Sequence, residues 1–145
     1  MQMPDVNILI HAHRRDDKDH IFYREWIERM VNGREPFALS ALVAVAFVRF
    51  VTDPSFPQEP TPLPQALAVV ESLRAHRNCR FLEPGARHWT VFRFCAEAAK
   101  ATGKRVADAQ HAALAIEHGC TWVTRDSDFL AFESAGLRLT HVVAG

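Results

Sequence analysis

The chain has 145 residues, of which 48% are hydrophobic and 23% charged, and its 17 basic and 17 acidic side chains give a formal net charge of zero. This composition is typical of a folded soluble protein, and no apolar run approaches the roughly 20 residues that a membrane helix needs. Zero net charge means that bulk charge alone does not indicate a nucleic-acid partner, which would need a local basic surface.

The cysteines indicate the cellular compartment. Cys79, Cys95 and Cys120 are odd in number and far apart, with no Cys-x-x-Cys pair. This spacing argues against a disulfide scaffold or a zinc knuckle and favours a reducing setting. The first residues carry neither the basic nor the apolar stretch of a secretory signal. We therefore expect a cytoplasmic protein.

Short apolar strands alternate with helices along the N-terminal half, which is the pattern of an α/β protein. The first strand leads into Asp5, and Asn7 is the expected cap of a brief helix that follows. The other elements expected in this half are a helix over Asp19–Val31 ended by Gly33, a strand over Pro36–Leu39, and a helix over Ala41–Thr52 capped by Ser40.

Five prolines between Asp53 and Pro64 exclude a helix there and predict a semi-rigid surface loop. The elements expected after it are helices over Gln65–His76, Ala86–Thr102 and Val106–His118, and strands over Arg80–Leu82, Cys120–Thr124 and Leu137–Val142. Strands joined by helices in this way predict one α/β domain over residues 1–145, with a central, mostly parallel sheet flanked by helices.

Three aspartates lie where such a fold places its chemistry. Asp5 follows the first strand, Asp126 follows the strand Cys120–Thr124, and Asp108 lies in the first turn of its helix. Ligands bind at the carboxyl ends of parallel strands, so Asp5 and Asp126 share one crevice if their strands are neighbours. The alternative is that each aspartate is only a turn, cap or helix-dipole residue.

Clustered carboxylates repel one another unless protons or a cation neutralise them, and Mg²⁺ prefers oxygen ligands of this kind. We therefore expect Asp5, Asp108 and Asp126 to hold a divalent cation for phosphodiester hydrolysis. Asp128 and Asn7 are expected to support the ligands without binding the cation themselves. Alternatively, Asp128 only caps the turn that follows it.

Four stretches in order along nearly the whole chain resemble the PIN-domain ribonucleases of the VapC toxin type. They are Pro4–Ile10, Leu39–Val43 with Phe47–Arg49 and Val51–Pro54, Val106–Ala109 with Ala112–Ala115, and Trp122–Phe129. The resemblance implies a three-layer PIN-like fold and an endoribonuclease that depends on Mg²⁺ or Mn²⁺. It also implies a homodimer that a cognate VapB-like antitoxin neutralises. By motif, Asp5, Asp108 and Asp126 fall on the family's metal-site acids, and Asp128 falls on a further acid of that site.

The chain departs from this pattern at one position. The family usually has a Glu one residue before the Phe of the Phe-Val-Arg segment, where this chain has Ala46. One interpretation is a working ribonuclease toxin, and the other is a PIN-like module that binds RNA or antitoxin without efficient cleavage. Asp16, Asp17 and Asp19 lie in a loop that could fold back to supply an acid, although a solvated loop face is the simpler account.

Other polar residues are weaker candidates. A phosphohydrolase of the haloacid-dehalogenase kind ranks last, because it needs Asp-x-Asp and this chain has Asp5-Val-Asn7.

The histidines considered as proton donors are His11, His13, His20 and His111. The basic residues expected to border the acids and contact RNA are Arg14, Arg15 and Arg125, with Lys18, Arg24, Lys104 and Arg105 nearby. Trp26, Trp89 and Trp122 are expected in the core or a dimer contact, and the helix Ala41–Phe50 in the homodimer or antitoxin surface.

Overall fold

A computed structural model describes all residues from Met1 to Gly145. Its centre is a five-stranded parallel sheet in the order β3-β2-β1-β4-β5. The strands are β1 (Gln2–Pro4), β2 (Phe37–Ser40), β3 (Cys79–Leu82), β4 (Thr121–Thr124) and β5 (Arg138–His141). The predicted α/β class with a parallel sheet is therefore confirmed.

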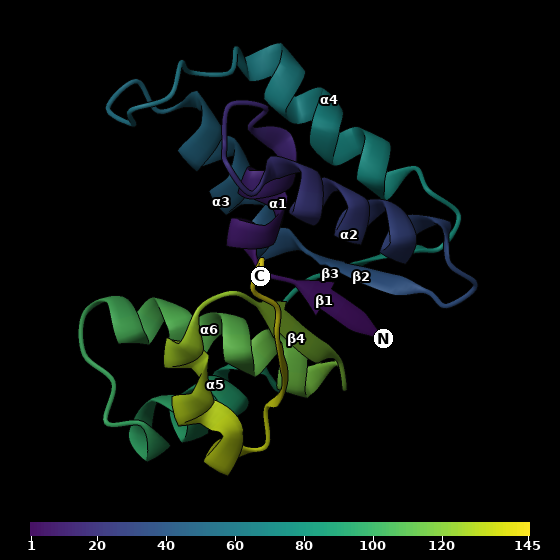
Figure 1. The fold of residues 1–145 in the computed structure, drawn as a ribbon. Helices are drawn as coiled ribbons and strands as arrows, with labels where there is room; N and C mark the ends of the chain where they lie inside the picture. Colours follow the sequence, from purple (N-terminus) through teal and green to yellow (C-terminus); the bar gives the residue numbers. More distant parts are fainter.

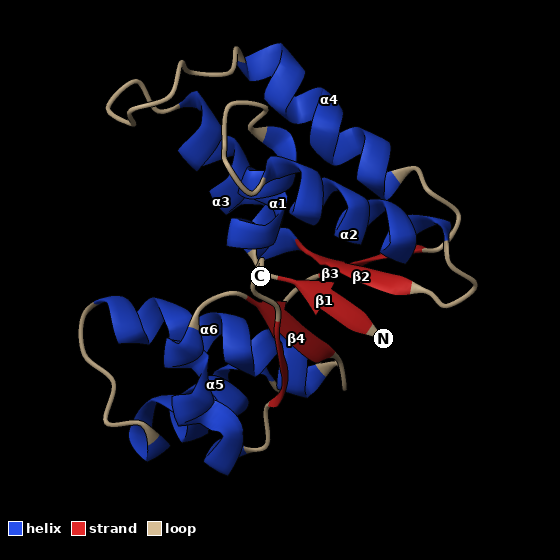
Figure 2. Ribbon diagram, viewed as in Figure 1, coloured by secondary structure: helices blue, strands red, loops and turns tan.

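Helices cover both faces of the sheet and give three layers, as Figures 1 and 2 show. The first group is α1 (Val6–His13), α2 (His20–Asn32), α3 (Ala41–Thr52) and α4 (Leu63–Arg74). The second group is α5 (His88–Ala98), α6 (Lys104–Glu117) and the 3₁₀ helix η1 (Ser127–Ala135). The two groups leave the carboxyl ends of the strands at the edge between them. No helix is long and apolar enough to cross a membrane.

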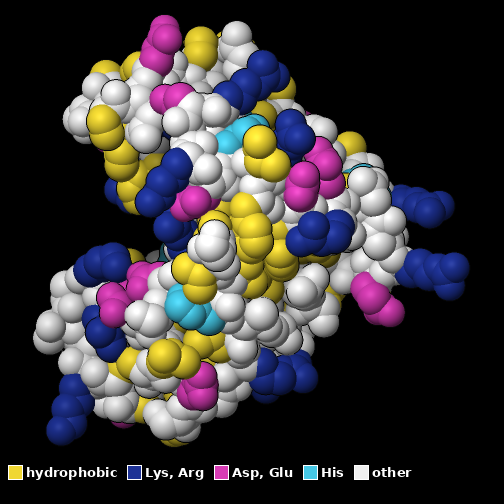
Figure 3. Space-filling model, in the orientation of Figure 1, with side chains coloured by type: hydrophobic (Ala, Val, Ile, Leu, Met, Phe, Trp, Pro, Cys, Tyr) yellow, Lys and Arg dark blue, Asp and Glu magenta, His cyan; other side chains and the backbone are white.

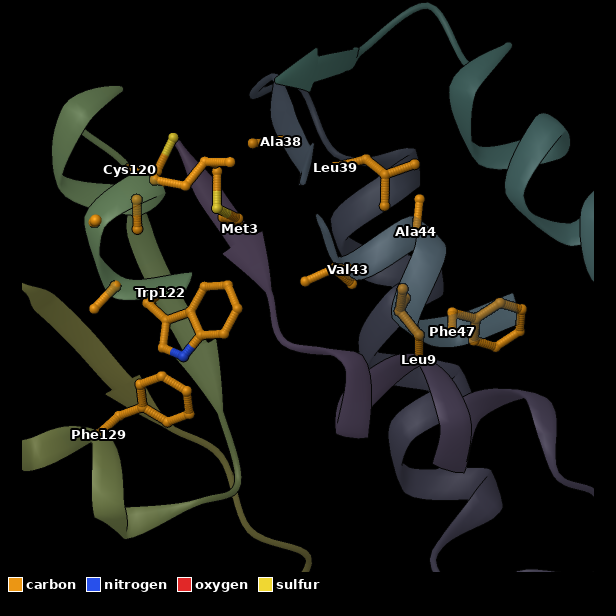
Figure 4. Close-up of a cluster of buried hydrophobic side chains, with 14 of the residues drawn as sticks. Met3, Leu9, Ala38, Leu39, Val43, Ala44, Phe47, Cys120, Trp122 and Phe129 are labelled. Carbon is orange, nitrogen blue, oxygen red and sulfur yellow. The ribbon is translucent and has the colours of Figure 1, made fainter. Parts of the chain in front are cut away.

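The core fills both sides of the sheet. Trp122 is fully buried and packs beside Phe129, while Leu39 and Phe47 are buried among the helices of the first group (Figure 4). Trp122 therefore belongs to the core, as predicted. Trp89 does not, because its side chain is 67% exposed.

Helix ends follow their capping chemistry, with one correction. Ser40 caps α3 as predicted, since its Oγ accepts a hydrogen bond from the Val43 N–H at 3.3 Å. The predicted cap Asn7 is wrong: Asp5 is the N-cap of α1 and accepts from the Val6 N–H at 2.6 Å, which leaves Asn7 inside the helix. The first carboxylate of the candidate site is thus fixed by the start of α1.

The proline-rich segment lies against the ends of α1 and α3. The Arg14 guanidinium is buried and donates to the Glu59 carbonyl at 2.6 Å and to the Val51 carbonyl at 3.3 Å. His13 shares a hydrogen bond with Thr61 at 2.9 Å. These contacts anchor the loop to the helical layer.

Candidate active site

Two neighbouring strands bring Asp5 and Asp126 to the same edge of the sheet. Pro4 pairs with Val123 in register, and the Asp5 N–H continues this pairing by donating to the Val123 carbonyl at 2.7 Å. Asp126 follows β4 two residues after Thr124. The strands are therefore neighbours, which is the condition that the sequence argument left open.

Asp108 reaches this edge from α6. It lies in the second turn, because the helix begins at Lys104 and not at Val106 as predicted. Ala112 and Ala115 on the same helix are fully buried, so α6 packs closely against the sheet. Asp108 is itself buried, and its charge acts on the carboxylates of both Asp5 and Asp126. The three predicted acids therefore lie near enough for their charges to interact, and we call Asp5, Asp108 and Asp126 the acid cluster.

Thr124 connects the two strand-end acids. Its buried hydroxyl donates to Asp5 Oδ2 at 2.7 Å and accepts from the Asp126 N–H at 3.0 Å. Asn7 Nδ2 also donates to this hydroxyl at 3.3 Å. Sequence reasoning missed Thr124 because a threonine in a β-rich run is fully explained by its strand propensity.

Burial sets the charge of the cluster. It raises the pKa of Asp5 to about 6, against the opposing hydrogen bonds from Thr124 and Val6 and with a smaller contribution from the charges of Asp126 and Asp108. Burial likewise raises the pKa of Asp108, although the nearby Lys104 ammonium opposes this. At neutral pH the Asp5 carboxyl is therefore ionised, and its buried negative charge calls for a counterion.

Lys104 supplies a positive charge at the cluster. Its Nζ lies 3.5 Å from Asp126 Oδ2, and its side chain is 74% exposed. The charge of Asp108 raises the pKa of this ammonium, and burial, which is slight, opposes the shift. Figure 3 shows the surface hollowed between the two helix groups, with basic and acidic side chains gathered beside the hollow.

The donor chemistry fits a hard divalent cation. The three carboxylates and the buried, unpartnered Asn7 Oδ1 all offer oxygen. No three Asp, Glu, His or Cys side chains are already arranged as a ligand set. Mg²⁺ commonly takes only one or two carboxylates and fills its other positions with water and phosphate oxygens, so the oxygen donors present are sufficient.

The position of Ala46 offers no carboxylate. It is half-buried on α3, between the exposed Val45 and the buried Phe47. Two of the three loop acids are held by other partners. Asp17 Oδ2 lies 2.6 Å from His11 Nδ1, and Asp19 Oδ2 lies 3.8 Å from an Arg125 nitrogen, so both already have cationic or polar partners.

Asp128 and Asn7 lie beside the cluster in different ways. The Asp128 N–H donates to Asp126 Oδ1 at 2.9 Å, so Asp126 is the cap of η1 and Asp128 is an exposed residue of its first turn. The turn predicted after Asp128 is in fact a full 3₁₀ helix. Asn7 contacts the acids only through Thr124.

The basic residues named from the sequence differ in how accessible their guanidinium groups are to RNA. Arg14 is buried under the proline-rich loop, so its guanidinium is not available to RNA. Arg15 is exposed. Arg125 precedes Asp126, donates to His11 Nε2, and lies over the Tyr23 ring. This leaves Arg15 and Arg125 from the predicted set.

The histidines have structural contacts. His111 stacks on Trp122, and burial lowers its pKa to about 4, so its ring is neutral at physiological pH. His20 Nδ1 is 3.1 Å from the His11 carbonyl. His13 bonds Thr61, and burial lowers its pKa. None of these contacts reaches a carboxylate of the cluster.

A separate open groove of about 990 Å³ lies between α1, α2 and α4. Its floor is apolar, with Leu9, Ile27 and Leu73, and its rim carries charged side chains such as Arg15 and Arg24. The side chain of Ile21 also lines the groove and is 62% exposed. A groove of this character suits an amphipathic segment of another protein.

Comparison with known proteins identifies the family. Residues 3–134 match the PIN domain model. Ribonuclease VapC43 of Mycobacterium tuberculosis strain H37Rv is 40% identical over 141 residues, which cover 97% of this chain and 95% of the relative. Ribonuclease VapC25 of the same strain is 36% identical over 134 residues, which cover 92% and 94%.

Solved structures share the fold. VapBC2 of Rickettsia felis, bound to a DNA fragment from its promoter, aligns with a TM-score of 0.67 at 16% identity over 97% of each chain. Mycobacterium tuberculosis VapC20, described as a Sarcin-Ricin loop cleaving toxin, aligns with a TM-score of 0.67 at 12% identity over 98% of this chain and 100% of that one. The chain therefore belongs to the PIN-domain family and, within it, to the VapC group.

Proposed function

We propose that the protein is a VapC-type endoribonuclease toxin that hydrolyses RNA with Mg²⁺ or Mn²⁺ and is neutralised by a VapB-like antitoxin. The observation that carries the proposal is the cluster of Asp5, Asp108 and Asp126 at the carboxyl edge of the sheet, where the Thr124 hydroxyl links the Asp5 carboxylate to the Asp126 N–H. The curated VapC relatives are named ribonucleases, which supports RNA as the substrate.

Different residues are proposed to bind the metal, to orient its ligands and to contact RNA. A bound divalent cation supplies charge stabilisation at the scissile phosphate and an activated water. Asp5, Asp108 and Asp126 would hold it, and the Thr124 hydroxyl keeps Asp5 oriented toward the cluster. Arg125, which directly precedes Asp126, is proposed to contact RNA phosphates beside the acids. Because the net charge is zero, we expect modest RNA affinity that falls as salt rises.

The test uses purified protein freed of antitoxin and a structured RNA such as tRNA. We expect cleavage only with added Mg²⁺ or Mn²⁺, and no cleavage by Asp5→Asn or Asp108→Asn. Direct titration with Mn²⁺ should show binding to the wild type and much weaker binding to either variant. Cleavage that persists in EDTA or in both variants would sink the metal mechanism.

A second function is favoured by Ala46. The family acid is missing at this position, which favours a module that binds RNA or antitoxin with little cleavage. The substitution Ala46→Glu separates the two. If the site is one ligand short, this variant binds Mn²⁺ more tightly and cuts RNA faster than the wild type. An unchanged affinity and rate would mean that the site has no use for a carboxylate there.

The groove between α1, α2 and α4 is the proposed antitoxin surface. Its apolar floor and charged rim suit an amphipathic segment, and several structural neighbours are toxin–antitoxin complexes such as VapBC2. We further propose a homodimer through α3, whose Val45 side chain is 72% exposed although the residue is apolar. The three unpaired cysteines support a cytoplasmic location.

A further inference from the structure

Lys104 is the cation nearest to the acid cluster. It is the first residue of α6, and its ammonium lies 3.5 Å from Asp126 Oδ2. No other Lys or Arg forms an ion pair with any acid of the cluster. The other oxygen of Asp126 is already engaged, because Oδ1 accepts from the Asp128 N–H at 2.9 Å. Lys104 therefore contacts the carboxylate oxygen of Asp126 that has no backbone partner.

The helix also sets Lys104 beside a second acid. Lys104 and Asp108 are four residues apart on α6, so their side chains share one face of the helix. The ammonium thus pairs with an acid from the strand edge and stands on the helix face that also carries Asp108. A lysine ammonium carries its positive charge at physiological pH.

A divalent cation bound by Asp126 would compete with the Lys104 ammonium for Oδ2 of that carboxylate. The two positive charges also repel each other at short range. The Lys104 side chain is long and 74% exposed, so it can rotate away from Asp126 without disturbing the core. RNA bound over the cluster brings phosphate oxygens to this edge, and these are acceptors for the displaced ammonium.

We propose that Lys104 is an exchangeable counterion of the cluster, which pairs with Asp126 in the metal-free protein and with an RNA phosphate once metal and RNA are bound. This inference rests on the proposed function, because it assumes a metal site at these acids. It predicts opposite effects on two ligands. Removing the ammonium makes metal binding tighter and RNA binding weaker.

The experiment measures both ligands on the full-length protein. Mn²⁺ is titrated calorimetrically into the wild type, Lys104→Met and Lys104→Arg. Lys100→Met is the matched control, since Lys100 is exposed and forms no ion pair with these acids. We expect Lys104→Met to bind Mn²⁺ about fivefold more tightly, the size expected from losing one exposed charge near the site. Lys100→Met should bind as the wild type does.

The second measurement is the KM for a short fluorescent RNA at saturating Mn²⁺ over a series of salt concentrations. We expect Lys104→Met to raise KM about fivefold. The slope of log KM against log salt concentration should also fall by about one, because one phosphate contact is lost. Lys104→Arg should stay near the wild type in both measurements. A purely structural role for Lys104 would not move the two affinities in opposite directions.

The outcomes separate this inference from the proposed function. If the wild type binds Mn²⁺ and Asp126→Asn does not, the proposed metal site stands. Lys104 is then the counterion only if Lys104→Met binds Mn²⁺ more tightly and RNA more weakly. An unchanged or weaker Mn²⁺ affinity, or an unchanged KM, overturns the inference alone. Failure of the wild type to bind Mn²⁺ overturns the proposed function and this inference with it.

Discussion

At the scale of single residues, the Thr124 hydroxyl decides how the two strand-end acids face each other. It donates to Asp5 and accepts from the Asp126 N–H, so its removal leaves a buried carboxylate oxygen and a backbone donor without partners. We expect Thr124→Val to lower Mn²⁺ affinity or RNA cleavage about 10- to 100-fold, as the loss of residues that orient metal ligands generally does. Titration and cleavage assays measure the two effects.

Thr124→Ser is the matched control, because serine keeps the hydroxyl and loses only a methyl group. We expect this variant to retain most of the activity. If Thr124→Val is folded by circular dichroism and as active as the wild type, the hydroxyl has no part in orienting Asp5.

The raised pKa of Asp5 predicts a pH dependence of stability. The folded protein keeps the Asp5 proton up to about pH 6, whereas the unfolded chain releases it near the ordinary value of 3.8. Between these values the folded state binds more protons, so the free energy of unfolding falls as pH rises through this window. The loss is about 3 kcal/mol for a shift of this size.

The measurement is urea unfolding of the metal-free wild type and Asp5→Asn between pH 4 and 7. We expect the stability of the wild type relative to Asp5→Asn to fall by this amount as the pH rises through that window. Added Mn²⁺ at pH 7 should stabilise only the wild type. A stability difference between the two proteins that does not vary with pH would show that Asp5 is not held protonated by burial.

Asp5 and Asp126 could be found from the sequence because each lies within two residues of the carboxyl end of a strand. Arg14 could not be placed in this way, because its position next to Arg15 suggests a basic surface and says nothing of the carbonyls of a distant loop. Its bonds to Glu59 in the proline-rich loop and to Val51 in the last turn of α3 depend on tertiary packing against α1.

At the scale of elements, β2 and β4 were predictable because each is a short, largely apolar and buried run that follows a helix. Helix ends were less so. The predicted helix Ala86–Thr102 is shorter in the structure, where α5 covers His88–Ala98 and Gly103, with a φ of 59°, leads into α6. Pro64 was assigned to the loop, yet it lies in the first turn of α4, where proline costs no hydrogen bond.

Glu117, at the end of α6, holds the segment that leads into α5. Its side chain is 7% exposed and accepts from the Gly85 N–H at 2.9 Å and from the Arg87 N–H at 3.0 Å. We expect Glu117→Ala to lower the free energy of unfolding by about 2 kcal/mol, because two backbone donors lose a charged acceptor. Thermal and urea unfolding measure the change.

Glu97 provides the comparison on α5. Its side chain is 68% exposed and pairs only with Arg93, so Glu97→Ala should change stability by less than about 0.5 kcal/mol. Equal effects of the two substitutions would show that the Glu117 contacts contribute no more than a surface ion pair.

At the scale of the whole molecule, two apolar surfaces lie apart from the acid cluster. One is the groove that Ile21 lines, and the other is the exposed face of α3 that carries Val45. Exposed apolar side chains of this kind mark contacts with other chains. The sequence indicated that α3 contacts either a second copy or an antitoxin, but it could not separate the two. The groove is a tertiary feature, because it forms only when α4, which follows the proline-rich loop, packs beside α1 and α2.

The two surfaces can be assigned by a pair of charge substitutions. If the groove receives the antitoxin, Ile21→Glu removes antitoxin binding and leaves both RNA cleavage and self-association unchanged. If α3 forms the dimer, Val45→Glu gives a monomer by light scattering and still binds antitoxin. A buried glutamate without a partner would cost either interface several kcal/mol, so each effect should be nearly complete. The reverse pattern would exchange the two surfaces, with the antitoxin on α3 and the second copy in the groove.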